Sequence, residues 1–288
     1  MDIEKYTKDF ETYLFRLGYA ESTIKHSKSA LERFLKHMQN QKIQDLSEVQ
    51  PNHLMAFNNH LHSLKSRITG LGLASSTIQG NINVIKQFSQ FLELTEQLKI
   101  YTIKLETTPS IKQHRNILSQ NQIKQLYKEC DDTIIGIRNK AILGLYYGCG
   151  LRYNEGIRLE MSHIDYKKEL LYIAPGKNYK SRFVPINQAV LKDFKDYEMY
   201  SRSHFKAKEN YFLAGSTSNS YLQTWLKNMS DKANIQTSIC LHSLRHSIAT
   251  HLLQQEMPLE QIAKFLGHTT LRATEIYTRI ILENEQAN

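Results

Sequence analysis

Two long blocks of helical periodicity, separated by a stretch without it, constrain the fold of this chain most. Apolar side chains recur every three or four residues over 4–94 and again from 118 onward, and only five prolines interrupt the 288 residues. Residues 99–116 mix Lys, Thr, Glu and Pro109 without a clean period. We therefore predict a mainly α protein with two domains, residues 1–98 and 117–288, joined by a linker over 99–116.

The first block predicts four helices, which is enough for a small all-α domain. An apolar stripe that includes Phe10, Leu14 and Leu17 predicts a helix over 4–17, and Ser22 is placed to cap a second helix. Two further helices are expected from Pro51 onward and over 76–94. Each of the four stripes predicts one buried helix face.

The second block is mostly helical and contains one small β-sheet. Short β-like runs at 170–174 and 181–186 flank a loop with a glycine, which is typical of a hairpin. A helix capped by Ser119 should run to about Cys130. Further helices are expected at 137–148, 187–200, 219–234, 243–255, 258–266 and 270–278.

Composition excludes several classes of protein. A hydrophobic content of 41% and a charged content of 23% are ordinary for a globular protein. No run reaches the roughly 18 to 20 apolar residues of a membrane span, and residues 1–10 lack a signal-peptide core, so we expect no membrane partner and a cytoplasmic location. Three cysteines without CxxC spacing predict reduced thiols. The net charge of +9 is compatible with a polyanionic partner.

The common signatures of bound cofactors are missing from the sequence. It contains no GxxxxGK[ST], GxGxxG or HExxH motif and no Cys/His spacing typical of zinc. His242 and His246, four residues apart on a predicted helix, could share a metal ion, but Arg245 between them would repel a cation. We therefore predict neither a cofactor nor a metal site.

The second block carries an ordered set of side chains suited to a phosphate group. Each has a structural alternative: an arginine can pair with a neighbouring Glu, a histidine can end a helix, and a tyrosine can fill the core. The order and spacing of the whole set favour a functional site. His242 and Arg245, which are three residues apart, share a helix face. The set consists of Arg152, Lys177, His242, Arg245, His268 and Tyr277.

These residues lie in phrases that resemble the tyrosine recombinase (phage integrase) family, of the two-domain Xer-like type. The phrases are Gly150-Leu-Arg-Tyr-Asn-Glu155, Gly176-Lys177, Leu241-His-Ser-Leu-Arg-His, Leu266-Gly-His268 and Thr274-Glu-Ile-Tyr277. The resemblance is specific over 141–277. It implies an N-terminal four-helix, SAM-like core-binding domain that clamps DNA together with a mostly helical catalytic domain.

The resemblance implies site-specific DNA strand transfer through a covalent 3′-phosphotyrosyl intermediate. Tyr277 would be the nucleophile, supplied within its own protomer or by an adjoining one. Arg152 and Arg245 would hold the phosphate, and His242 would accept the proton of the phenol. His268 would bind the phosphate and align the tyrosine.

Two residues near this set have supporting or competing roles. Lys177 would protonate the departing 5′-oxygen, and Lys180 is a rival for that role because the loop departs from the commoner Gly-Lys-Gly-x-Lys pattern. Glu155 would orient Arg152.

The implied partner is double-stranded DNA with a specific recombination site, bound by a homotetramer or by a heterotetramer with a paralogue. Integration, excision, inversion and dimer resolution all use this chemistry, without a metal ion or ATP. The alternatives are a non-catalytic DNA-binding relative, a type IB topoisomerase and a metal-dependent nuclease.

Overall fold

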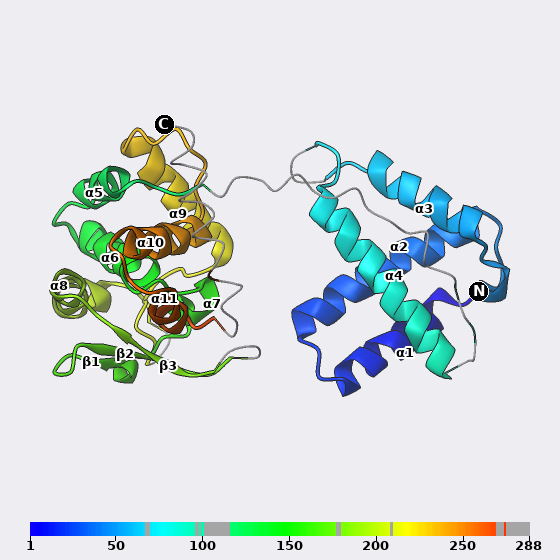
Figure 1. Cartoon of the computed structure of the whole chain (residues 1–288), viewed down its shortest axis with the longest axis horizontal. Coiled ribbons are helices and arrows are strands. Elements are labelled where there is room, and N and C mark those ends of the chain that lie inside the picture. Colours follow the sequence, from blue (N-terminus) through cyan, green and yellow to red (C-terminus); the bar gives the residue numbers. More distant parts are fainter. Residues whose placement is uncertain are drawn as a thin grey trace. The chain divides into compact units, whose positions relative to one another are not determined.

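The computed structural model describes residues 1–66, 70–95, 98, 100, 116–176, 180–207, 210–268 and 274. The chain divides into two compact units, residues 1–113 and 114–288 (Figure 1). The predicted linker over 99–116 lies outside the described residues except at positions 100 and 116. The prediction of a mainly α protein with a small sheet is confirmed.

The first unit contains the four predicted helices among its described residues. They are α1 (Ile3–Arg16), α2 (Glu21–Asn40), α3 (Pro51–Ser63) and α4 (Ser75–Thr95), with a short 3₁₀ turn at Leu46–Glu48. Their apolar stripes meet in one core whose central phenylalanines are fully buried. Phe34 and Phe57 pack edge to face with ring centroids 5.1 Å apart, as do Phe10 and Phe88 at 5.4 Å.

Two predictions for the first unit are wrong in detail. Helix α2 begins at Glu21 with Ala20 as its N-cap, so Ser22 lies inside the first turn and does not cap the helix. Leu17 is 55% exposed, although its spacing matches the apolar stripe of α1. Helix α1 ends at Arg16, and the turn that follows removes Leu17 from the buried face.

In the described part of the second unit, a three-stranded antiparallel sheet lies at one edge of the group of helices (Figure 1). The strands are β1 (Ile164–Asp165), β2 (Leu170–Ile173) and β3 (Arg182–Pro185), in the order β1-β2-β3. The predicted hairpin is present, and β1 was not predicted because a strand of two residues leaves no periodic signal. Strand β3 contacts the last described helix, α11 (Leu259–Leu266) (Figure 1).

A helix of five residues at Tyr153–Ile157 was not predicted, because it is too short to show a periodic apolar stripe, and the other helices of the second unit follow the predicted order. Ser119 caps α5 and accepts a hydrogen bond from Gln122, as expected. The helix predicted at 137–148 begins earlier, at Ile134, because Thr133 caps it, and after Leu143 it continues as a π-helical turn. The helix predicted over 270–278 lies outside the described residues except at Thr274. The helices are α5 (Gln120–Lys128), α6 (Ile134–Leu143), α7 (Tyr153–Ile157), α8 (Gln188–Asp196), α9 (Asn219–Lys232), α10 (Leu241–Gln254) and α11.

The three cysteines carry free thiols, as predicted, and Cys130 and Cys149 are buried. Burial raises the pKa of each of these two thiols to about 12, which keeps both protonated at neutral pH. Within the described part of the chain, no helix has the length and apolar character needed to cross a membrane.

Candidate active site

A glycine turn places Arg152 at the start of α7. Gly150 has a φ of 59°, in the left-handed region that favours glycine, and it turns the chain out of the buried segment before it. Arg152 is the N-cap residue of α7, and its backbone N–H donates to Glu155 Oε2 at 2.8 Å. The Arg152 Nη1 atom donates to Glu155 Oε1 at 2.9 Å. The three-residue spacing therefore brings this ion pair together across one helical turn.

Arg152 and Arg245 meet at one backbone carbonyl. Arg152 Nη1 donates to the carbonyl oxygen of Leu266 at 3.4 Å, and Arg245 Nη2 donates to the same oxygen at 2.7 Å. Arg152 Nη2 also donates to Gly267 O at 3.2 Å, and Arg245 Nη1 donates to Gly150 O. The fold thus brings together two arginines that lie far apart in the sequence.

The end of α11 supplies the acceptors for both guanidinium groups. Gly267 has a φ of 67° and ends the helix, and the N–H of His268 reaches back to Ala263 O at 2.9 Å. The last carbonyls of a helix have no partner within the helix and carry partial negative charge. They are therefore favourable acceptors for cationic donors such as Arg152 and Arg245.

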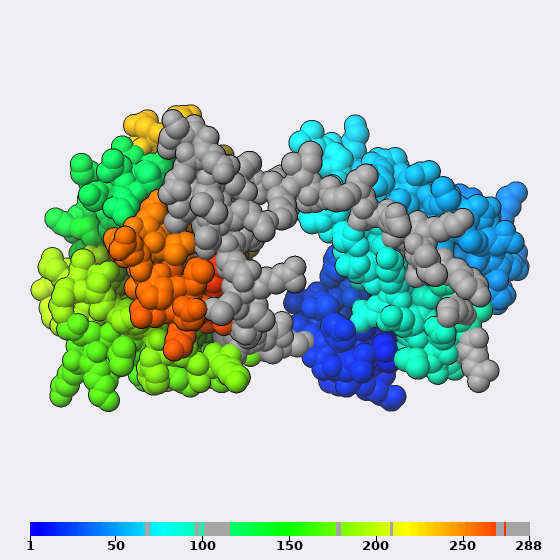
Figure 2. Space-filling view, viewed as in Figure 1, coloured from blue at the N-terminus to red at the C-terminus, as the bar shows by residue number. Residues whose placement is uncertain are grey.

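Burial differs between the two arginines. The Arg245 side chain is 4% exposed and that of Arg152 is 29% exposed, while the Glu155 side chain is fully buried. Residues of α10 and α11 reach the surface of this unit, orange in Figure 2. Two guanidinium groups on one turn, one of them accessible, form a site that favours an anion.

A third arginine, which was not predicted from the sequence, holds the same carboxylate. Arg182 of β3 donates through Nη1 to Glu155 Oε1 and through Nη2 to Glu155 Oε2, both at 2.9 Å. Arg245 Nη1 lies 3.8 Å from Glu155 Oε2. Burial would raise the pKa of Glu155, but its bonds to Arg182, the N–H of Arg152 and the charge of Arg245 outweigh burial and lower the pKa below its usual range.

One sequence signal could have identified Arg182. Side chains alternate between the two faces of a strand, so positions 182 and 184 point the same way. Val184 is fully buried, and the Arg182 side chain on the same face is only 8% exposed. An arginine at an inward position of a strand requires a buried partner, because an unpaired buried charge is costly.

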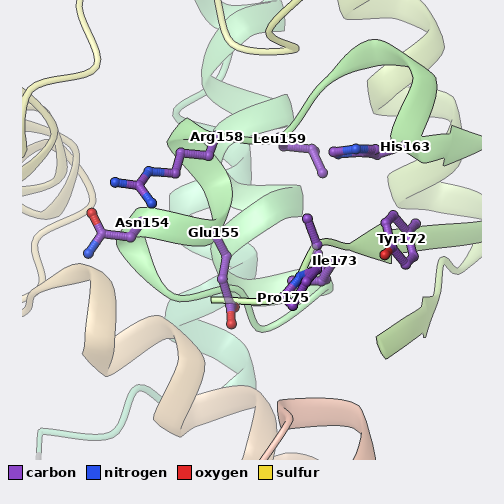
Figure 3. A pocket seen from close by; sticks show the side chains of 9 residues that line it. Asn154, Glu155, Arg158, Leu159, His163, Tyr172, Ile173 and Pro175 are labelled. Carbon is purple, nitrogen blue, oxygen red and sulfur yellow. The ribbon is translucent and has the colours of Figure 1, made fainter. Parts of the chain in front are cut away.

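A small pocket of about 50 Å³ lies between α7 and the sheet, with Glu155 in its wall. Figure 3 shows the Glu155 side chain extending from α7 beside Pro175, while Arg158 leaves the helix in another direction. His163 and Tyr172 line the pocket near the sheet and pack edge to face, with ring centroids 5.4 Å apart. The pocket is far smaller than a site for a nucleotide cofactor.

Helix α10 carries His242 and Arg245 on neighbouring turns. Cys240 is the N-cap residue, so His242 lies in the first turn and is exposed. Its ring packs edge to face against His246, with centroids 6.1 Å apart. Among the residues that the structure describes, no group of three His, Cys, Asp or Glu side chains is placed to hold a metal ion.

His268 follows the glycine that ends α11, so it lies next to the carbonyls that bind Arg152 and Arg245. Its Nδ1 atom is 2.8 Å from the hydroxyl oxygen of the buried Thr274. This contact places Thr274, three positions before Tyr277 in the sequence, beside the cluster.

Two of the six predicted side chains, Lys177 and Tyr277, lie outside the described residues. Lys180, the rival of Lys177, is described and exposed. The structure therefore brings Arg152, Arg245 and the turn before His268 together, with His242 one helical turn before Arg245.

The family models that match this chain describe phage integrases, and the curated relatives that match it are tyrosine recombinases. A model of the phage integrase family matches residues 116–283, and a model of the phage integrase N-terminal SAM-like domain matches residues 7–96. The tyrosine recombinase XerD of Oceanobacillus iheyensis is 29% identical, over 96% of this chain and 94% of the relative. The tyrosine recombinase XerA of Pyrococcus furiosus is 27% identical, over 95% of this chain and 88% of that protein.

Solved structures share the fold at lower identity. The XerH site-specific recombinase bound to a palindromic difH substrate, in a post-cleavage complex, has a TM-score of 0.74 and 19% identity. That match covers 92% of this chain and 78% of XerH. The Tn1549 transposon integrase in complex with transposon right end DNA has a TM-score of 0.73 and 14% identity, over 96% of this chain and 94% of the integrase.

Proposed function

Because the chain belongs to the phage integrase family, we propose that it is a site-specific DNA recombinase that cuts and rejoins strands through a covalent 3′-phosphotyrosyl intermediate. This proposal rests on one observation: Arg152 and Arg245 both donate hydrogen bonds to the carbonyl oxygen of Leu266. This arrangement supports the binding of one phosphate by two guanidinium groups.

A phosphodiester resists attack because its non-bridging oxygens are anionic and its leaving alkoxide is poor. Arg152 and Arg245 donate charge-assisted hydrogen bonds to these oxygens through their planar, forked guanidinium groups. The charge on the oxygens grows in the pentacoordinate transition state, so these donors stabilise it more than the ground state. One such donor contributes about 3 kcal/mol, which is roughly a hundredfold in rate.

Tyr277 is the proposed nucleophile. Its phenol has a reference pKa of about 10, so attack requires a proton acceptor, and His242 at the start of α10 takes this role. The phenolic oxygen forms a bond to phosphorus and the P–O5′ bond breaks. Lys177, or its rival Lys180, gives a proton to the departing 5′-oxygen.

Three features complete the proposed chemistry. His268 hydrogen-bonds the phosphate and aligns the nucleophile. Glu155 orients Arg152 through the contacts described above. The phosphotyrosyl linkage retains the energy of the broken bond for religation to another 5′-hydroxyl, so the reaction needs no metal ion or nucleotide.

The proposed partner is duplex DNA with a recombination site, bound in the cytoplasm by a homotetramer or by a heterotetramer with a paralogue. Relatives with the names XerC and XerD are recombinases, and XerH and the Tn1549 integrase have been solved on DNA. The two units of this chain, residues 1–113 and 114–288, clamp the duplex in this proposal.

Covalent capture tests the proposed function. The protein is incubated with nicked duplexes of randomised sequence, and DNA that stays attached under denaturing conditions is amplified and sequenced. We expect a common recombination site to emerge and capture to persist in EDTA. Failure to capture any strand would contradict an active recombinase and would favour a non-catalytic DNA-binding relative.

Two controls separate the remaining alternatives. Capture that disappears in EDTA would indicate a metal-dependent nuclease. Relaxation of supercoiled plasmids without any sequence requirement would indicate a type IB topoisomerase.

Removing the first unit should weaken DNA binding. The second unit has its own hydrophobic core, so residues 114–288 are expected to fold alone. We expect the affinity of this fragment for the captured site to fall at least about tenfold, with a shallower salt dependence, because fewer phosphates are contacted. Equal affinity and equal salt slope in a binding titration would contradict a role for the first unit in the clamp.

A further inference from the structure

Arg182 is a nearly buried arginine whose guanidinium is committed to internal contacts. Its side chain is 8% exposed and donates from all three nitrogens. Nη1 and Nη2 form a forked pair with the two oxygens of Glu155, and Nε donates to Phe265 O at 2.9 Å. A forked arginine–carboxylate pair fixes the plane of the carboxylate as well as its position.

These contacts join the two supports on which Arg152 and Arg245 rest. The carboxylate of Glu155 also binds Arg152 through its backbone N–H and its Nη1 atom. The carbonyl of residue 265 directly precedes the carbonyls of 266 and 267, which accept from Arg152 and Arg245. One guanidinium thus links α7, β3 and the end of α11.

The packing at Gly267 shows how closely Arg182 lies against this turn. A Cβ atom at position 267 would be 2.8 Å from Arg182 Nη1 and 2.9 Å from Arg182 Cδ, closer than real Cβ contacts. The guanidinium therefore fills the space that a side chain at 267 would need. Because His268 is the next residue, the same packing fixes the backbone from which that imidazole projects.

Arg182 also follows the loop that carries the two candidate general acids. Lys177 and Lys180 precede it by five and two positions in the sequence. Anchoring Arg182 to Glu155 and to residue 265 therefore fixes the point where this loop enters β3.

Charge distinguishes the role of Arg182 from that of the other two arginines. Three guanidinium groups share the single carboxylate of Glu155, so the cluster keeps excess positive charge, which favours a phosphate. Arg152 is the accessible member, whereas Arg182 directs its fork at Glu155.

We propose that Arg182 is a positioning residue for strand cleavage: it fixes the carboxylate of Glu155 and the turn at 265–267, and so holds Arg152 and Arg245 ready for the scissile phosphate. It does not itself touch the DNA. This inference rests on the proposed function, because it assigns Arg182 a part in the same reaction.

The test compares Arg182→Lys with Arg202→Lys on the captured DNA site. Lysine keeps the charge but cannot form the fork and the third hydrogen bond together. Arg202 is a matched control, since it is partly buried and donates to the carbonyls of Tyr211 and Phe212.

At saturating protein, we expect the rate of single-turnover formation of the covalent complex to fall about 30-fold for Arg182→Lys, because small misplacements of catalytic groups cost up to about a hundredfold in rate. The Kd for DNA should change less than about threefold, and Arg202→Lys should leave the rate within about threefold.

A neutral scissile linkage separates positioning from a general loss of structure. A methylphosphonate replaces one charged non-bridging oxygen by a methyl group, so the arginines have less charge to stabilise. We expect the rate deficit of Arg182→Lys to shrink at least about fivefold on this linkage. The fraction of folded protein cancels, because one preparation cleaves both substrates.

The outcomes distinguish this inference from the proposed function. If the unmodified protein forms no covalent complex, the proposed function fails and this inference fails with it. If the unmodified protein cleaves and Arg182→Lys cleaves as fast, only the role of Arg182 is wrong. An equal deficit on both linkages would make Arg182 merely structural, and an equal loss of affinity and rate would make it a DNA-binding residue.

Discussion

Replacing Tyr277 by Phe should abolish the covalent protein–DNA complex while leaving DNA binding intact. The substitution removes only the phenolic oxygen, which is the atom proposed to form the bond to phosphorus. Deleting a catalytic nucleophile costs on the order of 10⁴-fold or more in rate. The measurement is denaturing gel electrophoresis after incubation with the nicked duplex, together with a binding titration under native conditions.

Tyr200→Phe is the matched control for this experiment. Tyr200 is a tyrosine of the same unit and is 55% exposed, so losing its hydroxyl should change neither binding nor cleavage. A covalent band that survives in Tyr277→Phe would assign the nucleophile to another residue. Loss of the band together with loss of binding would show that Tyr277 acts in recognition or folding.

Replacing Glu155 by Gln should destabilise the second unit by about 3 kcal/mol at neutral pH. The glutamine keeps the shape of the side chain, but it leaves the nearly buried charges of Arg182 and Arg245 without their carboxylate. Breaking a buried ion pair from one side typically costs about 3 to 5 kcal/mol. The urea midpoint of the second unit should fall accordingly. Strand cleavage should fall as well, because Arg152 loses the partner that orients it.

The pH dependence of this effect has a definite sign. The folded state lowers the pKa of Glu155, so the carboxylate stabilises the fold fully above the unfolded pKa of about 4.3. That stabilisation is lost as the pH falls through the lower folded value. The difference in free energy of unfolding between the unmodified protein and Glu155→Gln should therefore be constant from neutral pH to about pH 5. It should narrow at more acidic pH.

Glu198→Gln is the control for Glu155→Gln. Glu198 is an exposed carboxylate that accepts a hydrogen bond from Tyr166 at 2.7 Å, so its replacement should change stability by less than about 1 kcal/mol. If the difference in free energy of unfolding between Glu155→Gln and the unmodified protein is the same in acid as at neutral pH, an electrostatic role for Glu155 is contradicted.

Local patterns predicted much of the fold because most helices here carry their own signal. The apolar stripes predicted the helices of both units except the five-residue α7, and Ser119 marked the start of α5. Other errors fall at element ends, such as Ser22 and Leu17, where the signal depends on a single turn. Strand β1 has two residues and is defined only by its pairing with β2.

Residue types and short spacings are local properties of the chain, so they show which side chains this chemistry has available and in what order. Which of these side chains meet depends on the packing of segments that lie far apart in the chain. Arg152 and Arg245 share the carbonyl of Leu266, and Arg182 reaches both Glu155 and the end of α11. These contacts join residues up to 114 positions apart, and they form because buried charges must find partners wherever packing places them.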